Sequence, residues 1–185
     1  MKLKFIILLI LIILAYGCSH VDSINQKKYS EVQPLSRAAM AGTWIGKVPP
    51  DFTVVTTEGK TVRLSDFARQ KRPVIVYFMT TWCPYCSQDY KALSKVYPIY
   101  EGNVSFISIS MDSSEDLISL MEYKKKYPEL KNTMFAARQN SILSDYSATQ
   151  TTKKFAIGKD GTVKYVALGV FDEGQWKKLL SEIAQ

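Results

Sequence analysis

The chain has 185 residues, of which 46% are hydrophobic and 22% charged, and its formal net charge is +7. This length accommodates one domain and a targeting segment, and a domain of this size buries enough surface to fold without disulfide cross-links. Its 3 cysteines are too few for a disulfide scaffold, and its short basic clusters lack the aromatic-interleaved stripe typical of nucleic-acid binding.

The first 17 residues are predicted to be a signal peptide. Lys2 and Lys4 precede an apolar run from Phe5 to Ala15, which is well short of the roughly 20 residues that span a bilayer. The segment Leu14-Ala15-Tyr16-Gly17-Cys18 resembles a bacterial lipobox, in which the chain is cut before the cysteine and a diacylglycerol is attached to its sulfur. The alternative is a signal anchor with an incidental cysteine.

On the lipobox interpretation, Cys18 attaches the protein to a membrane on its extracytoplasmic side, either in the periplasm or at the cell surface. The mature chain then carries 22 basic against 17 acidic residues, a net charge of +5. Residues 18–47 are predicted to be a polar tether and residues 48–185 a single domain. Pro49-Pro50 marks the domain entry, because proline donates no backbone hydrogen bond.

The domain begins with a predicted hairpin. Two β-prone segments, 52–56 and 61–64, flank Glu58-Gly59, and a short helical turn is expected from Ser65. The next segment, 74–79, is apolar without alternation, which is typical of a strand buried on both faces.

A helix with one buried face is expected after this strand. Apolar residues recur there at spacings of three and four, at Cys86, Tyr90, Leu93, Tyr97 and Tyr100. A second strand is expected over 104–111. The helix after it is expected to stop at Pro128 and to bury three residues: Leu117, Leu120 and Met121.

The last third of the chain closes the predicted domain. A short strand over 135–138 and a small helix over 141–146 precede a hairpin of residues 155–157 and 163–168. Asp172 is expected to cap a final helix whose apolar residues share one face: Trp176, Leu179, Leu180 and Ile183. Strands that alternate with helices and end in a hairpin and a helix predict a three-layer α/β domain.

The candidate site is the segment Thr81-Trp82-Cys83-Pro84-Tyr85-Cys86, where the buried strand gives way to the helix. Two cysteines separated by two residues in a first helical turn can approach within disulfide distance. Unpaired backbone N–H groups and the positive end of the helix dipole favour Cys83 as the attacking thiolate, and Cys86 as the more buried resolving thiol. Pro84 fits the first helical position, where its missing N–H is not needed.

The sequence therefore predicts a redox-active Cys83–Cys86 disulfide that needs no other cofactor. A permanent disulfide and half of a zinc site are the alternatives. A closed zinc site normally needs four ligands, and the single histidine, His20, lies in the tether, so no metal site is predicted.

This motif combines with other segments to resemble the TlpA/ResA-type thioredoxin-like family of the redoxin (AhpC/TSA-like) superfamily. The segments are Pro50-Asp51-Phe52, residues 59–67, Ile109-Ser110-Met111-Asp112 and residues 155–161, so the resemblance runs from about Val48 to the C-terminus. It implies a thioredoxin-like three-layer sandwich, with an N-terminal β-hairpin and a central mixed β-sheet that has helices on both faces. It also implies a membrane-tethered thiol-disulfide oxidoreductase that reduces disulfides of secreted or cytochrome c-maturation proteins. An integral-membrane thiol electron donor would re-reduce it.

Two positions depart from the family pattern. ResA-type proteins carry a glutamate, associated with proton transfer, three residues after the second cysteine; here the residue is Asp89, for which an exposed helix position is the alternative. Thioredoxin-like proteins place a cis-proline opposite the cysteines, where this chain has Thr152 after Thr151. Because a non-proline cis bond costs about 2.5–4 kcal/mol, we expect a trans bond, a loop that still faces the site, and an altered substrate-docking edge. Trp82 and Tyr85 complete the expected supporting residues.

Other functions remain as alternatives. A peroxiredoxin-type peroxidase is suggested by Thr80, three residues before Cys83, but Val76 stands where that family has a proline, and no arginine stands near Thr152. A copper-delivery module would need a histidine in the domain, and a redox-inert lipoprotein would have little reason to keep both thiols. Extracytoplasmic proteins with this chemistry include reductants, oxidants and isomerases, and the resemblance favours a reductant.

Overall fold

The computed structural model describes residues 42–185. The predicted signal peptide, Cys18 and most of the predicted tether lie outside the described residues, so those predictions stay predictions. None of the helices between residues 42 and 185 is long and apolar enough to cross a membrane.

Two short strands form the predicted hairpin at the start of the domain. Strand β1 (Thr53–Val55) pairs antiparallel with β2 (Thr61–Arg63), and the chain continues directly into helix α2 (Leu64–Arg69). Val54 is buried between two exposed neighbours, which is the alternation of a strand with one face on the core.

The main sheet has five strands in the order β5-β4-β3-β6-β7. Strands β3 (Val74–Met79), β4 (Ser105–Ser110) and β5 (Met134–Ala136) are parallel. Strands β6 (Lys154–Ile157) and β7 (Val163–Ala167) run antiparallel to their neighbours. The sheet is therefore mixed, as predicted.

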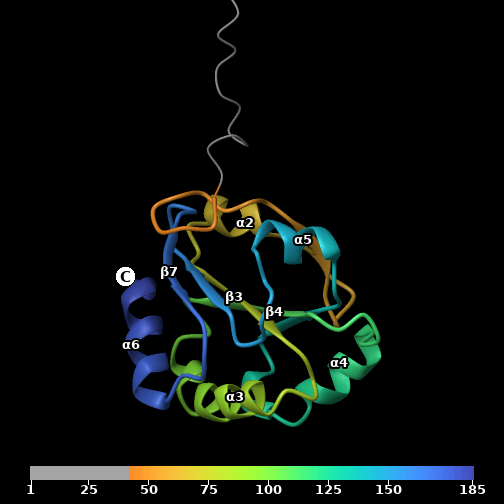
Figure 1. Cartoon of the computed structure of the whole chain (residues 1–185). Helices are drawn as coiled ribbons and strands as arrows, with labels where there is room; N and C mark the ends of the chain where they lie inside the picture. The colour runs from red at the N-terminus through yellow and green to blue at the C-terminus, as the bar shows by residue number, and fades with distance from the viewer. Residues whose placement is uncertain (1–41) are drawn as a thin grey trace, which may run out of the picture. The chain divides into compact units, whose positions relative to one another are not determined.

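Helices cover both faces of this sheet. Helices α2 and α5 (Asn140–Asp145) lie on one side, and α3 (Pro84–Val96) lies on the other (Figure 1). Helix α6 (Glu173–Ala184) packs against α3, and α4 (Leu117–Lys124) packs against β5. This arrangement confirms the predicted three-layer α/β domain.

The central strand β3 explains why both faces need cover. Ile75, Tyr77 and Met79 belong to the core cluster that contains the buried faces of α3 and α6. The alternate residues Val74, Val76 and Phe78 belong to the cluster that contains the buried residues of α2 and α5. All six side chains are buried, which accounts for the unbroken apolar run in the sequence.

Two expectations about the helices are wrong in detail. Helix α3 ends at Val96 and gives way to the 3₁₀ turn η2 (Tyr97–Ile99), because Pro98 has no backbone N–H to continue the α-helical pattern. In α4, Met121 is exposed, and Leu120 and Tyr123 form the buried face instead. That helix ends at Lys124, before the second 3₁₀ turn η3 (Pro128–Leu130).

Helix α6 begins and packs as predicted. The Asp172 side chain accepts from the backbone N–H of Gln175, and the Gln175 side chain accepts in return from the Asp172 N–H, which forms a capping box. The four predicted apolar residues are all buried: Trp176, Leu179, Leu180 and Ile183.

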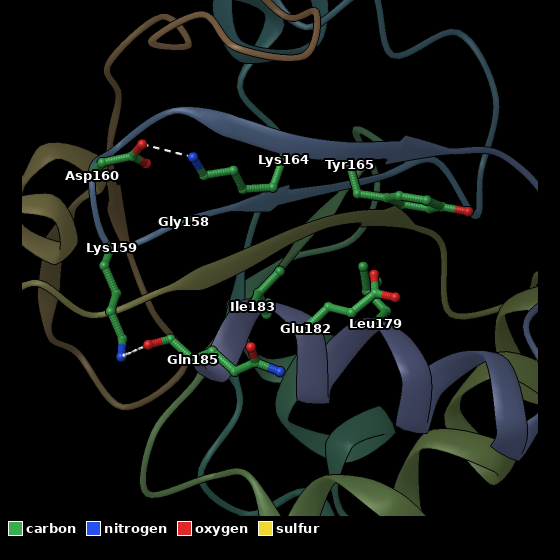
Figure 2. Close-up of a pocket in the computed structure, with 9 residues that line it drawn as sticks. All are labelled: Gly158, Lys159, Asp160, Lys164, Tyr165, Leu179, Glu182, Ile183 and Gln185. Carbon is green, nitrogen blue, oxygen red and sulfur yellow. Dashed lines mark hydrogen bonds and ion pairs between the residues drawn. The ribbon is translucent and has the colours of Figure 1, made fainter.

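A hollow of about 380 Å³ lies between the β6–β7 turn and the last turns of α6 (Figure 2). Lys159 Nζ donates to the backbone oxygen of Gln185 at its rim, and Lys164 Nζ donates to Asp160 Oδ2 at 2.7 Å. None of its lining residues comes from β3 or α3, so it is separate from the cysteine pair.

Candidate active site

The two cysteines lie where strand β3 passes into helix α3. Cys83 is the N-cap residue of α3, and Pro84 occupies the first turn. The Cys83 sulfur accepts a hydrogen bond from the backbone N–H of Cys86 at 3.2 Å, and both residues are buried free thiols. A sulfur at this position receives N–H donors and the positive end of the helix dipole, which stabilise a thiolate. The structure thus brings Cys83 and Cys86 together in the expected geometry.

Cys86 lies one turn further into the helix and has no exposed surface. Burial raises the pKa of its thiol to about 12, and the neighbouring Cys83 adds to the shift. The Thr80 backbone and the Tyr77 hydroxyl lower this pKa but do not offset the burial. Cys86 is therefore protonated at neutral pH, and its attack on another sulfur requires removal of its proton.

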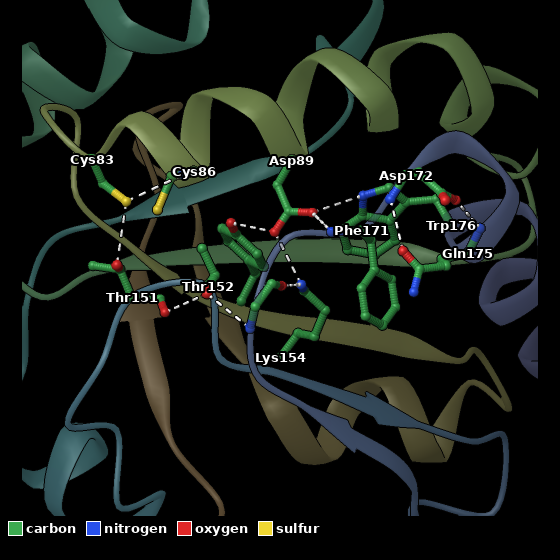
Figure 3. A network of polar contacts seen from close by, with 12 residues as sticks. Cys83, Cys86, Asp89, Thr151, Thr152, Lys154, Phe171, Asp172, Gln175 and Trp176 are labelled. Atoms are coloured by element: carbon green, nitrogen blue, oxygen red, sulfur yellow. Dashed lines mark hydrogen bonds and ion pairs between the residues drawn. The ribbon is translucent and has the colours of Figure 1, made fainter.

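The loop between α5 and β6 reaches the cysteine pair (Figure 3). Thr151 Oγ1 lies 3.2 Å from Cys83 Sγ, close enough for a hydrogen bond. No cis peptide bond occurs between residues 42 and 185, so the Thr151–Thr152 bond is trans, as predicted.

Thr152 closes this loop with its backbone and its side chain. Its φ is 66°, a left-handed value that a β-branched residue rarely adopts. Its backbone N–H donates to the Phe78 oxygen at 2.8 Å. Its hydroxyl donates to the Thr151 oxygen at 2.5 Å and accepts from the Gly169 N–H at 3.1 Å. The Thr151 carbonyl is therefore already engaged within the loop.

An open groove of about 650 Å³ lies beside this loop, and it is lined by Tyr85, Gln150, Thr151, Thr152, Leu168, Gly169 and Val170. Trp82, Tyr85 and Leu168 are 68%, 61% and 55% exposed, which leaves large apolar surfaces uncovered near the cysteines. Exposed aromatic and aliphatic surface of this kind is suited to contact with another protein.

The loop between β4 and α4 holds the segment before Cys83. Glu115 Oε1 accepts from both the backbone N–H and the hydroxyl of Thr81 at 2.6 Å, and Glu115 Oε2 accepts from the Ser110 hydroxyl at 2.5 Å. Asp112 Oδ2 accepts from the Trp82 indole N–H at 2.7 Å. Two carboxylates from this loop therefore fix the two residues that precede Cys83.

Asp89 is buried beneath the cysteine pair, so the alternative of an exposed helix position is wrong. Its Oδ2 atom accepts from the Tyr77 hydroxyl at 2.9 Å and from Lys154 Nζ at 3.0 Å. Its Oδ1 atom accepts from the Phe171 N–H at 2.7 Å and from the Trp176 indole N–H at 3.2 Å (Figure 3). Four donors surround this carboxylate, as a buried charge requires.

Lys154 is the buried cation that pairs with Asp89. Its side chain has no exposed surface, and its Nζ atom also donates to the Gly169 oxygen at 2.6 Å. The ammonium lies 4.1 Å from the centre of the Phe171 ring, at cation–π distance. Burial lowers the pKa of Lys154, and the Asp89 charge acts in the opposite direction.

The sequence interpretation missed four of these residues: Tyr77, Asp112, Glu115 and Lys154. The carboxyl ends of neighbouring parallel strands meet at one edge of a sheet, so acidic residues after β4 could have been expected beside the loop after β3. Lys154 heads an apolar strand, and a lysine in that context needs a buried partner. Tyr77 gave no signal beyond its place in an apolar run.

Comparison with known proteins identifies relatives of the chain. The sequence profile of the AhpC/TSA family matches residues 45–166. A thiol-disulfide oxidoreductase ResA of Bacillus cereus is 31% identical over 140 residues, which cover 75% of this chain and 78% of that protein. The chloroplastic peroxiredoxin Q of Triticum aestivum is 30% identical over 147 residues, which cover 72% of this chain and 65% of that protein.

Solved structures resemble the domain at lower identity. A thiol:disulfide interchange protein of the thioredoxin family from Chlorobium tepidum superposes with a TM-score of 0.63 at 20% identity, over 74% of this chain and 94% of that chain. The fold of the domain is thus that of thioredoxin, and the predicted sandwich is confirmed.

Proposed function

The chain belongs to the AhpC/TSA family and, within it, to the ResA-type thioredoxin-fold thiol-disulfide oxidoreductases, and from this premise we propose that it reduces disulfides of extracytoplasmic proteins through Cys83 and Cys86. The observation that carries the proposal is the placement of Cys83. Its sulfur caps helix α3, lies 3.2 Å from the Thr151 hydroxyl, and stands beside an open groove.

The reaction takes two thiol-disulfide exchanges. The Cys83 thiolate attacks one substrate sulfur, and the other substrate sulfur leaves as a thiolate. Cys86 then loses its proton and attacks the Cys83 sulfur, which breaks the bond between Cys83 and the substrate. Both electrons come from the cysteine pair, which becomes a disulfide. A dithiol of an integral-membrane carrier then re-reduces it.

The reduction potential of the soluble domain tests this proposal. A reversible two-electron couple with a reduction potential of about −270 mV or lower is expected for a reductant. A reduction potential of about −120 mV would make the protein an oxidant. The Cys86→Ser variant should accumulate a mixed disulfide with a protein substrate, and Cys83→Ser should form none. Absence of both the couple and the trapped species contradicts a redox role for the pair.

Membrane attachment through a lipid on Cys18 is the second part of the proposal. A domain anchored in this way would act on proteins outside the cytoplasm, namely secreted or cytochrome c-maturation proteins. The full-length chain should incorporate a labelled fatty acid, and Cys18→Ala should incorporate none. If the unmodified chain incorporates no labelled fatty acid, the lipid anchor is ruled out.

A peroxidase is the second candidate, and Thr80 favours it. This residue precedes Cys83 by three positions, its hydroxyl is buried, and it has no hydrogen-bond partner among residues 42–185. We expect the reduced domain to consume hydrogen peroxide far more slowly than it reduces a protein disulfide. Rapid peroxide consumption that depends on Cys83 would reverse this order.

A further inference from the structure

A tight turn at the start of the domain presents two large apolar side chains to solvent. Trp44 is 60% exposed and Ile45 is 64% exposed. The Lys47 N–H donates to the Trp44 oxygen at 3.2 Å, and Gly46 has a φ of 85°, a left-handed value that favours glycine. Trp44 therefore opens a hydrogen-bonded β-turn, and Ile45 stands at its apex.

Hydrogen bonds to strand β7 hold this turn in place. The Gly46 N–H donates to the Val163 oxygen at 2.8 Å, and the Val163 N–H donates to the Lys47 oxygen at 2.8 Å. The Trp44 ring lies against Gly42, so closely that a Cβ added to this glycine would come within 2.7 Å of the ring. The two exposed side chains are therefore presented by a fixed part of the fold.

The turn lies at the end of the sheet opposite to the cysteine pair. Val163 pairs with Ile157 on β6, and Ile157 pairs with Val74, the first residue of β3. Cys83 follows the other end of this six-residue strand, which is about 20 Å long. Figure 1 shows the start of the domain in orange near α2, on the side away from α3.

The charges beside the turn favour an anionic surface. Lys47 closes the turn, and Lys71 follows α2, whose Ala68 lies against the loop between β6 and β7. Neither lysine forms an ion pair within residues 42–185. Asp160 in the β6–β7 loop is paired with Lys164. Cationic side chains of this kind are attracted to anionic lipid headgroups.

The predicted lipid anchor keeps this turn close to a membrane. Residues 19–41 separate Cys18 from Gly42, and a chain of that length spans at most roughly 80 Å. Attachment within this reach gives the turn a high local concentration beside the bilayer, so even a weak contact is populated. Tryptophan is enriched at membrane–water interfaces, because its ring is apolar and its N–H is polar.

We propose that the Trp44–Ile45 turn docks on the surface of the membrane that carries the lipid anchor. The inference rests on the second part of the proposed function, the lipid on Cys18. The two side chains enter the boundary between headgroups and acyl chains, and the neighbouring lysines face anionic headgroups. The cysteine pair then points away from the bilayer, toward substrate proteins. A contact of two side chains is weak enough to release, so the domain can also turn toward a carrier in the membrane.

Quenching of fluorescence by phospholipids with brominated acyl chains tests this contact, because bromine quenches only tryptophans that reach the chains. The protein has 3 tryptophans, of which Trp176 is buried and Trp82 is 68% exposed near Cys83. The full-length, lipid-carrying protein is reconstituted into phosphatidylcholine–phosphatidylglycerol vesicles with and without bromine. We expect quenching in the unmodified protein and in Trp82→Phe, and none in Trp44→Phe.

Two outcomes of this experiment overturn the proposal. Quenching that persists in Trp44→Phe would come from another tryptophan. Absence of quenching in the unmodified protein would leave the turn in water, where it is free to bind a protein instead of the membrane.

Ile45→Glu keeps the Trp44 fluorescence and places a negative charge at the apex of the turn. We expect it to lose most of the quenching, because a charged side chain opposes entry into the lipid. The matched control is Ile118→Glu on α4, at the cysteine end of the sheet, where the isoleucine is 66% exposed. Its quenching should equal that of the unmodified protein, and equal quenching in Ile45→Glu contradicts the docking.

The labelled fatty acid distinguishes failure of the docking from failure of the anchor. A protein that carries the label but shows no quenching of Trp44 contradicts the docking alone. A chain that carries no label contradicts the anchor and the docking together, whereas its reduction of protein disulfides is a separate measurement.

Discussion

Thr151 brings a hydroxyl to the Cys83 sulfur from a loop 68 residues further along the chain. A hydrogen bond to a charged acceptor contributes about 1.5–3 kcal/mol, so this hydroxyl can stabilise a Cys83 thiolate by donating to it. Thr151→Val keeps the shape of the side chain and removes the donor. We expect alkylation of Cys83 at neutral pH to slow by roughly tenfold.

The matched control for this change is Thr149→Val, in the same loop but with an exposed side chain. Its alkylation rate should equal that of the unmodified protein. Equal rates in Thr151→Val and the unmodified protein would mean that the helix N-terminus alone stabilises the thiolate.

Single residues of the site could be predicted only where local geometry determines the role. Cys83, Pro84 and Cys86 are specified by their positions in one helical turn, so the sequence alone predicts their arrangement. The sequence alone is compatible with two environments for Asp89, a place in the active site and an exposed helix position. Its burial depends on Lys154, which is 65 residues away along the chain and becomes its partner only when β6 pairs with β3.

At the scale of elements, the loops after β3 and β4 are joined through Glu115. Glu115 is only 7% exposed, and its carboxylate accepts three hydrogen bonds from Thr81 and Ser110. Glu115→Ala removes the acceptor of these donors, and of the three only the Ser110 hydroxyl keeps another, the Asp112 oxygen at 3.4 Å. Because each unsatisfied buried donor costs roughly 1–3 kcal/mol, we expect the free energy of unfolding to fall by about 2–4 kcal/mol.

Urea denaturation of the reduced protein measures this loss, with Glu122→Ala as the control. Glu122 lies on α4, and its ion pair with Lys125 is between two exposed side chains. Such pairs contribute about 0–1 kcal/mol, so the control should be nearly neutral. Similar losses in the two variants would show that Glu115 does not join the loops.

The elements themselves follow closely from hydrophobic patterning. The apolar run at 74–79 coincides with β3, because a strand with helices on both faces needs apolar residues at every position. The α4 face was harder to predict, since Leu117, Leu120 and Met121 and the face observed at Leu120 and Tyr123 both fit helical spacing. Only the packing against β5 decides between them.

At the scale of the whole molecule, the domain buries the phenol groups of several tyrosines and one thiol. Burial raises the pKa of five tyrosines across both core clusters: Tyr77, Tyr90, Tyr97, Tyr123 and Tyr146. It also raises the pKa of Cys86 to about 12. In the unfolded chain the thiol and the phenol groups have pKa values of about 8.5 and 10, respectively.

The domain should therefore lose stability steeply in alkali. Groups with raised pKa values stay protonated in the folded state, so their contribution is complete at neutral pH and declines once the unfolded chain starts to lose these protons. Because the unfolded-state phenols are half ionised at about pH 10, the slope for six such groups rises through that pH towards a limit of about 8 kcal/mol per pH unit, which is comparable with the total stability of a typical domain. Lys154, whose pKa is lowered, acts in the opposite direction but is one group against six. We expect the domain to unfold at about pH 11.

Tyrosinate absorbance and far-ultraviolet circular dichroism, followed together against pH, measure this transition. The five tyrosines whose pKa burial raises should ionise in one steep phase that coincides with the loss of helix signal, because they are released only by unfolding. If all tyrosines ionise in one broad phase with the helix signal retained, the core admits hydroxide without unfolding and the linkage between phenol burial and stability is wrong.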